Sequence, residues 1–125
     1  MSSKIHTNNA PAAIGPYSQA IVTGNLIFTS GQIALNPETG ALEGENITEQ
    51  THRVCKNLSA VLTEAGGSLE SAVKTVCFLS DMAEFAEFNA VYGQYFTEKP
   101  ARSCVAVKEL PKGALVEVEV VAEIC

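Results

Sequence analysis

The chain has 125 residues, and its 8 Lys and Arg side chains against 14 Asp and Glu give a formal net charge of −6 at pH 7. That length predicts a single domain over residues 1–125, large enough to bury a core without metals or disulfides. Proteins that bind nucleic acid through its phosphates need an excess of Lys and Arg, whereas the cations here are scattered and form no run. Nucleic acid and anionic membranes are therefore disfavoured as partners.

Two further features bear on where the protein works. Residues 1–4 are followed by no apolar segment of the secretory kind, and no stretch approaches the roughly 18–20 apolar residues that span a bilayer. The cysteines lack the C-x-x-C spacing of a zinc site or a dithiol pair. They are Cys55, Cys77, Cys104 and Cys125. We expect a cytoplasmic protein with free thiols.

The first third of the chain predicts strands joined by turns. Ile5 lies in a short candidate strand, and the prolines and glycine of residues 8–16 predict a loop. Two β-rich runs follow at 18–23 and 26–33, and the pair Gly24-Asn25 between them suits a tight hairpin.

The middle of the chain changes to a helical period. The segment 36–40, with its Asn, Pro and Gly, is a strong turn signal. Asn46 with Glu49 three residues later predicts a helix cap, and Gly66-Gly67 predicts the end of that helix. Between them an apolar stripe recurs at three- and four-residue steps: Val54, Cys55, Leu58, Val61, Leu62 and Ala65.

The last third predicts a strand at 73–79, a second helix beginning near Asp81 and Glu84, and two more strands at 101–107 and 115–124. Pro100 ends the region of the second helix. Aromatic side chains lie mostly on one side of that helix: Phe85, Phe88, Tyr92, Tyr95 and Phe96. The order β-β-β-α-β-α-β-β predicts an α+β fold, a mixed or antiparallel six-stranded sheet with two helices packed on one face.

The last two strands bring chemistry to this sheet. Side chains alternate along a strand, so Val116, Val118 and Val120 share one face while Glu117 and Glu119 share the other. The preceding strand has two faces as well. One carries Ser103, Val105 and Val107, and the other carries Arg102, Cys104 and Ala106. If both valine faces cover the helices, the arginine and the thiol share a side of the sheet with the two glutamates.

Two interpretations of that juxtaposition stay open on spacing alone. One is a surface salt bridge, worth about 0–1 kcal/mol. The other is a site for a small anion, because the planar fork of Arg102 suits bidentate binding of a carboxylate and Glu117 could activate a water molecule.

Three separated motifs resemble the Rid (YjgF-type) family of reactive-intermediate deaminases. The C-terminal motif comprises residues 100–105 with Leu110 and residues 116–118, and the others are residues 10–20 and 28–33. Because Arg102 and Cys104 occur together, the chain most resembles the RidA branch. It departs from the pattern at Val118, where Ile or Met is usual, and in a shorter connection at 97–100.

The resemblance implies a chorismate-mutase-like fold that assembles as a homotrimer with sites in the clefts between subunits. It implies hydrolysis of 2-imino acids, which derive from 2-aminoacrylate and 2-aminocrotonate enamines, to 2-oxo acids and ammonia. Those enamines are released by pyridoxal-phosphate-dependent dehydratases acting on serine or threonine. No metal or organic cofactor is implied.

The same resemblance implies roles for individual residues. Arg102 is the anchor for the substrate carboxylate, and Glu117 is the acid that positions the attacking water. Cys104 lies beside the substrate and acts more through its backbone groups than through its thiol. A further set shapes the pocket or supplies a polar group at its edge: Tyr17, Ser30, Gly31 and Asn89.

Other functions remain alternatives. A ribonuclease or translation inhibitor, a role attached to some relatives by name, is disfavoured by the acidic charge and the lack of paired catalytic histidines. We expect His6 and His52 to be surface or packing residues. A non-catalytic or chaperone-like protein could use the same cleft to bind small carboxylates or exposed apolar segments. Cys104 as a nucleophile is a minor possibility, because no histidine stands ready to activate it.

Overall fold

The computed structural model describes residues 1–125. Its strands and α-helices follow one another as β1 (Ser2–Ile5), β2 (Ala20–Thr23), β3 (Leu26–Thr29), α1 (Ile47–Ala65), β4 (Ala72–Leu79), α2 (Phe85–Tyr95), β5 (Ala101–Ala106) and β6 (Val116–Glu123). Short 3-10 turns lie at Leu69–Ser71, Met82–Glu84 and Pro111–Gly113. The predicted order of strands and helices is confirmed.

The six strands form one sheet in the order β1-β2-β3-β6-β4-β5. Neighbouring strands are antiparallel except β4 and β5, which are parallel, so the predicted mixed sheet is confirmed. Thr23 pairs with Leu26 across the two-residue turn of the predicted hairpin. The strand expected over 26–33 ends at Thr29, because beyond it only Gln32 pairs with β6, through an isolated bridge to Val118.

Both predicted ends of α1 are confirmed. The Asn46 side chain accepts a hydrogen bond from the Glu49 amide at 2.9 Å, which satisfies one free donor of the first turn. Gly66 ends the helix in the left-handed region, with φ of 93°, where a side chain is disfavoured. Asp81 caps the short turn that precedes α2, so the α-helix itself begins later, at Phe85.

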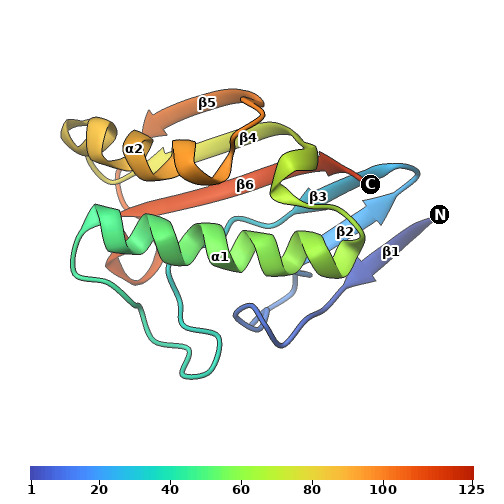
Figure 1. Ribbon diagram of the computed structural model, residues 1–125. Coiled ribbons are helices and arrows are strands. Elements are labelled where there is room, and N and C mark those ends of the chain that lie inside the picture. Colours follow the sequence, from blue (N-terminus) through green and yellow to red (C-terminus); the bar gives the residue numbers. More distant parts are fainter.

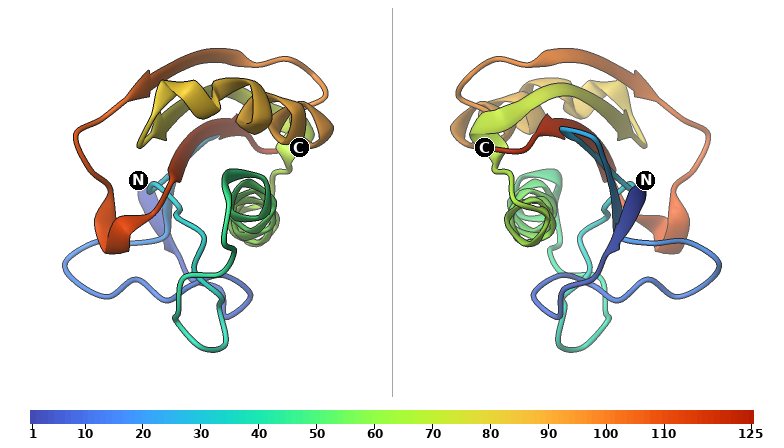
Figure 2. Two further views of the ribbon diagram at one scale, coloured as in Figure 1. Left: turned by 90° about the vertical axis from the view of Figure 1, so that its left-hand side faces the viewer. Right: turned by 90° about the vertical axis from the view of Figure 1, so that its right-hand side faces the viewer.

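Both helices lie on the same side of the sheet (Figure 1). Figure 2 shows the sheet curving around α1, which lies in its concave side. The apolar stripe of α1 packs there against the buried valines of β6 in one core, which includes Val54, Leu58, Leu62, Phe88, Val116, Val118 and Val120. No helix is both long and apolar enough to cross a membrane.

The opposite side of the sheet, which we call the open face, has no helix over it. Its side chains are half-buried or exposed, and many are apolar: Ile21, Phe28, Val76, Phe78, Val105 and Val121. Glu117 and Glu119 project from β6 among them, as the alternation of that strand predicts.

Candidate active site

The register of the last three strands separates the predicted site residues. Thr75 pairs with both Arg102 and Val120, and Cys77 with both Cys104 and Val118. Lateral partners in a sheet project on the same face, so Arg102 and Cys104 lie on the helix-covered face with the buried valines. The prediction that they share a face with Glu117 and Glu119 was wrong.

The error arises from taking the valines of β5 as markers of the core. Val105 pairs with Phe78, which pairs with Glu117, so Val105 lies on the open face, where it is 47% exposed. Because the open face is itself apolar and β5 is an edge strand, a valine there does not identify the helix side.

Arg102 is held in a cluster formed with one side of α2, which we call the arginine cluster. Its Nη1 donates a hydrogen bond to Asn89 Oδ1 at 2.6 Å. Its Cζ atom lies 5.4 Å from the ring centroid of Phe85 and 4.8 Å from that of Tyr92. The three helical residues are spaced by four and three positions, so one side of α2 presents them together. The structure thus brings Asn89 to Arg102.

The guanidinium has no acidic partner. The one ion pair within the chain joins Arg53 to Glu43 at 3.7 Å, although acidic side chains outnumber basic ones. Two rings and a neutral amide hold Arg102, so its charge stays uncompensated and most of its five N–H donors stay free. A carboxylate is the ligand such a group binds best.

A hollow opens beside the cluster. It has a volume of about 400 Å³ and includes Asn89, Tyr92 and Arg102 in its lining, together with residues from the end of α2 and the following connection. This hollow is large enough for a small molecule of a few carbon atoms, as the resemblance requires.

Glu117 belongs to a second cavity, which we call the glutamate pocket. It has a volume of about 540 Å³, and Tyr17, Gly31 and Glu117 all line it. A Cβ atom on Gly31 would overlap the Glu117 carboxylate, so the missing side chain leaves the space that the carboxylate occupies. Burial, and secondly the charge of Glu119, raise the pKa of Glu117.

Ser30 positions the wall of the glutamate pocket. Its hydroxyl donates to the Ser18 carbonyl at 2.6 Å and its amide to the Gln19 carbonyl at 2.9 Å, beside Tyr17. The buried Gln19 side chain accepts from the Thr7 amide and donates to the carbonyls of Thr7, Ala10 and Pro11, so it fixes the N-terminal loop. The sequence analysis did not single out Gln19, although it lies within the N-terminal motif.

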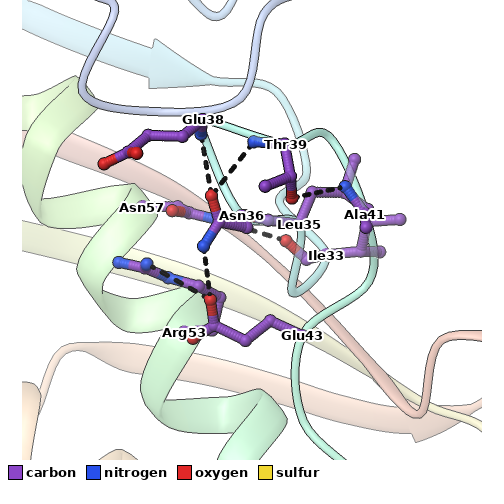
Figure 3. Close-up of polar contacts among 9 residues, drawn as sticks. All are labelled: Ile33, Leu35, Asn36, Glu38, Thr39, Ala41, Glu43, Arg53 and Asn57. Carbon is purple, nitrogen blue, oxygen red and sulfur yellow. Dashed lines mark hydrogen bonds and ion pairs between the residues drawn. The ribbon is translucent and has the colours of Figure 1, made fainter.

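Residues 37–40 of the predicted turn form another wall of the glutamate pocket, and Figure 3 shows the contacts that hold this turn. Asn36 Oδ1 accepts hydrogen bonds from the amides of Glu38 and Thr39, at 2.8 and 3.2 Å, so the predicted turn is confirmed. Its Nδ2 donates to Glu43, whose carboxylate pairs with Arg53 of α1. The wall is therefore fastened to the helix layer, and it lines the pocket together with Lys112, a cation that the sequence analysis missed.

Cys104 presents its backbone groups at the free edge of the sheet. The Val107 amide donates to the Leu79 carbonyl of β4 at 2.9 Å. Backbone groups of alternate strand residues face the same neighbour, so the N–H and C=O of Cys104 face outward at the free edge of the sheet. Burial raises the pKa of its thiol, against the lowering effect of Arg102, and the thiol therefore stays protonated near neutral pH.

The histidines lie apart from both cavities. His6 hydrogen-bonds Asn8 near the N-terminus, and His52 Nδ1 lies 2.8 Å from the Tyr95 hydroxyl between the two helices. No group of three or more His, Cys, Asp and Glu side chains gathers in a way that could hold a metal ion. Within one chain the structure forms two partial sites, the arginine cluster and the glutamate pocket, on opposite sides of the sheet.

A family model described as Endoribonuclease L-PSP matches residues 7–124. The chain belongs to this family, which is the Rid (YjgF-type) family. A RutC family protein of Synechocystis sp. is 54% identical over 121 residues, which cover 94% of this chain and 93% of the relative. The 2-iminobutanoate/2-iminopropanoate deaminase of Salmonella typhimurium is 44% identical over 126 residues, with 98% of each chain covered.

Solved structures also match the chain over nearly its whole length. RidA from the Antarctic bacterium Psychrobacter sp. matches with a TM-score of 0.93 and 41% identity, over 98% of this chain and 99% of that one. E. coli TdcF with bound serine matches with a TM-score of 0.92 and 39% identity, over 97% and 98% of the two chains. These matches confirm the resemblance seen in the sequence and the predicted α+β fold.

Proposed function

We propose that this Rid protein hydrolyses 2-imino acids, the tautomers of 2-aminoacrylate and 2-aminocrotonate, to 2-oxo acids and ammonia. The observation that carries the proposal is the rigidly held Arg102 without an acidic partner. Such a group recognises the one feature that all these substrates share, a carboxylate next to the imine carbon.

A homotrimer would complete the site. Arg102 and Glu117 project from opposite sides of the sheet, so one chain cannot direct both at one small substrate. The apolar open face carries Glu117, and burying that face between copies would remove apolar surface from water. The arginine cluster of one copy would then meet the glutamate pocket of its neighbour, where excluded water strengthens their electrostatic effects.

The chemistry needs little beyond orientation. Arg102 binds the carboxylate, and Glu117 accepts a proton from a water molecule as that water adds to the electrophilic imine carbon. Glu117 passes this proton to the former imine nitrogen, which completes the carbinolamine. The carbinolamine then collapses to the 2-oxo acid as its hydroxyl proton moves to the nitrogen and the C–N bond breaks to release ammonia. The raised pKa of Glu117 makes its carboxylate a stronger base for this step. The outward backbone groups of Cys104, with Tyr17 and Ser30, would complete the walls.

The place of this reaction follows from the instability of its substrate. Pyridoxal-phosphate-dependent dehydratases acting on serine or threonine release the enamines, and we propose that this protein acts next to them in the cytoplasm. The E. coli relative with bound serine shows a small amino acid on a protein of the same fold.

The test is a coupled assay in which threonine dehydratase generates the imine and the appearance of 2-oxobutanoate is followed. The protein should accelerate imine breakdown, and Arg102→Ala should lower kcat/KM by ~100-fold or more, since a charge-assisted bidentate contact is lost. Arg102→Lys should recover only a small part, and Lys108→Ala, which removes an exposed cation, should have no effect. Full activity in Arg102→Ala would refute the anchor.

The family model's description makes ribonuclease activity the second candidate. The acidic net charge opposes it, and neither cavity contains a histidine pair, since His6 bonds Asn8 and His52 bonds Tyr95. RNA cleavage by the purified trimer that disappears in Arg102→Ala would favour this candidate over the deaminase.

A further inference from the structure

We propose that Tyr92, fixed by a hydroxyl–hydroxyl bond to Thr75, is a positioning residue that holds the Arg102 guanidinium in the plane required for carboxylate binding. This inference rests on the proposed function and assigns the device that orients its anchor. It concerns two buried polar residues that the hydrolytic step does not use.

The bond lies between the sheet and α2. The Tyr92 hydroxyl is 2.7 Å from Thr75 Oγ1, and both residues are buried, with Thr75 only 1% exposed. The Cys77 thiol is a weak donor to the same Thr75 oxygen at 3.9 Å. A tyrosine hydroxyl buried in a core is costly unless it is bonded, so Thr75 fixes where this ring can lie.

The residue that fixes the ring is also the lateral partner of the arginine. Thr75 pairs with Arg102 in the β4–β5 ladder, so the backbone of one is held beside the backbone of the other. From Thr75 the hydroxyl bond leads to Tyr92, and the Tyr92 ring leads back to the guanidinium, whose Cζ is 4.8 Å from its centroid. These three contacts form a closed loop that sets the guanidinium relative to its own strand.

The contact with the Tyr92 ring sets the plane of the Arg102 guanidinium, whereas the hydrogen bond to Asn89 sets its orientation within that plane. The planar guanidinium of an arginine favours stacking parallel or nearly parallel to the face of an aromatic ring, and it keeps its charge there. The hydrogen bond from Nη1 to Asn89 then selects the rotation within that plane. Bidentate binding of a carboxylate needs both, because two parallel N–H groups must point at two oxygens.

The ring is supported from within the core as well. Tyr92 stacks on Phe96, with centroids 4.6 Å apart and planes 20° apart, and Phe96 is buried. Removing the Tyr92 hydroxyl therefore leaves a packed ring without the hydrogen bond that fixes the position of its outer end. Removing the ring leaves the guanidinium without the aromatic face on which it lies.

The experiment compares Thr75→Val, Tyr92→Phe, Tyr92→Leu and the Thr75→Val/Tyr92→Phe double variant, all as purified assembled protein. Tyr95→Phe is the matched control, since it removes a hydroxyl from the same helix that bonds His52 rather than Thr75. Calorimetric titration with 2-oxobutanoate measures carboxylate binding, and the coupled assay separates KM from kcat. Thermal unfolding verifies that each variant is folded.

We expect ~3-fold weaker 2-oxobutanoate binding for either hydroxyl deletion and ~10-fold for Tyr92→Leu, from the loss of orientation and of the cation–π contact. The loss should fall on KM with little change in kcat, because carboxylate anchoring acts alike in ground and transition states. The double variant should bind no worse than either single variant, since both remove the same bond, and Thr75→Ser should bind like the wild type. Tyr95→Phe should be unchanged.

A second measurement separates this inference from the proposed function. Nitrogen-15 NMR of the arginine side chains should show slow rotation of the Arg102 guanidinium in the free wild type and faster rotation in Thr75→Val and Tyr92→Leu. Unchanged rotation and unchanged 2-oxobutanoate binding in Tyr92→Leu, or in the hydroxyl deletions should Tyr92→Leu not fold, would overturn the positioning role. The wild type could show slow rotation of the Arg102 guanidinium but neither bind 2-oxobutanoate nor accelerate imine breakdown. In that case the proposed function fails, whereas the positioning of Arg102 by Tyr92 stands.

Discussion

The two sides of the sheet hold charged groups in opposite ways. On the helix-covered side, Arg102 lies on aromatic rings with its hydrogen-bond geometry fixed by neutral partners. On the open side, the Glu117 carboxylate packs against Gly31, which has no side chain, and its pKa is raised by burial and by the charge of Glu119. One side keeps a cation charged and unpaired, and the other makes a carboxylate more basic.

The difference supports the proposed anion site in a small fold with an acidic net charge. The sheet separates Arg102 from Glu117 and Glu119, and no acidic side chain of the chain forms an ion pair with it. Variants on each side of the sheet can test whether the separation of Arg102 from Glu117 is required for activity.

The largest effect should come from Phe28→Asp, which places a charge in the centre of the open face. Phe28 is 42% exposed in the single chain, so the fold should survive, whereas an assembly that buries this face should not. We expect a monomer by light scattering and loss of nearly all imine hydrolysis. Met82→Asp is the control, because Met82 is equally exposed, at 42%, but precedes α2. An active trimer of Phe28→Asp would show that the open face is not the interface.

Glu117→Gln should have the next largest effect. It keeps the shape of the side chain but removes the base, so we expect kcat to fall ~100-fold with 2-oxobutanoate binding retained, as for general-base loss. Steady-state kinetics and calorimetric titration measure the two quantities separately. Loss of binding with kcat preserved would assign Glu117 to substrate anchoring instead.

Gly31→Ala should cause a moderate loss. The added methyl group would overlap the Glu117 carboxylate and displace it, and we expect kcat to fall ~10-fold because a misplaced base loses much of its efficiency. Gly24→Asn is the control, since a Cβ at this turn position meets nothing within 4 Å and asparagine tolerates the left-handed backbone there. Equal activities of the two variants would mean that the close packing at Gly31 has no catalytic role.

The smallest effect concerns pH. The reaction needs the Glu117 carboxylate, whose pKa is raised, so the acid limb of kcat/KM should lie above the ordinary range of a glutamate. Glu119→Gln removes the neighbouring negative charge that contributes to this rise, and the limb should move to lower pH. A limb that stays in place in Glu119→Gln would mean that another group controls it.

Much of the fold could be predicted from local signals. Asn46 and Gly66 mark the ends of α1 because capping and left-handed backbone require those residue types, and the alternation in β6 places its valines and glutamates correctly. The end of β3 could not be predicted, since residues 30–33 keep a strand-like composition while only Gln32 still pairs with the sheet.

The site could be predicted only in part. The motifs indicated candidate residues, but the faces of β5 could not be assigned, because apolar side chains occupy both sides of that edge strand. The aromatic stripe of α2 predicted core packing, and Tyr92 is indeed buried; its second role beside Arg102 depends on a register between distant strands that no local pattern encodes. The separation of Arg102 from Glu117 likewise follows from pairing alone.

The most direct test of the central claim is activity in mixed assemblies of Arg102→Ala and Glu117→Gln chains. Each variant alone should be nearly inactive. When the two are co-assembled in equal amounts, a site that takes Arg102 from one copy and Glu117 from its neighbour is intact in roughly a quarter of cases, from independent assortment around a closed ring. We predict about that fraction of wild-type imine hydrolysis. Mixed trimers, verified by mass spectrometry, that remain as inactive as their parents would contradict a site shared between copies.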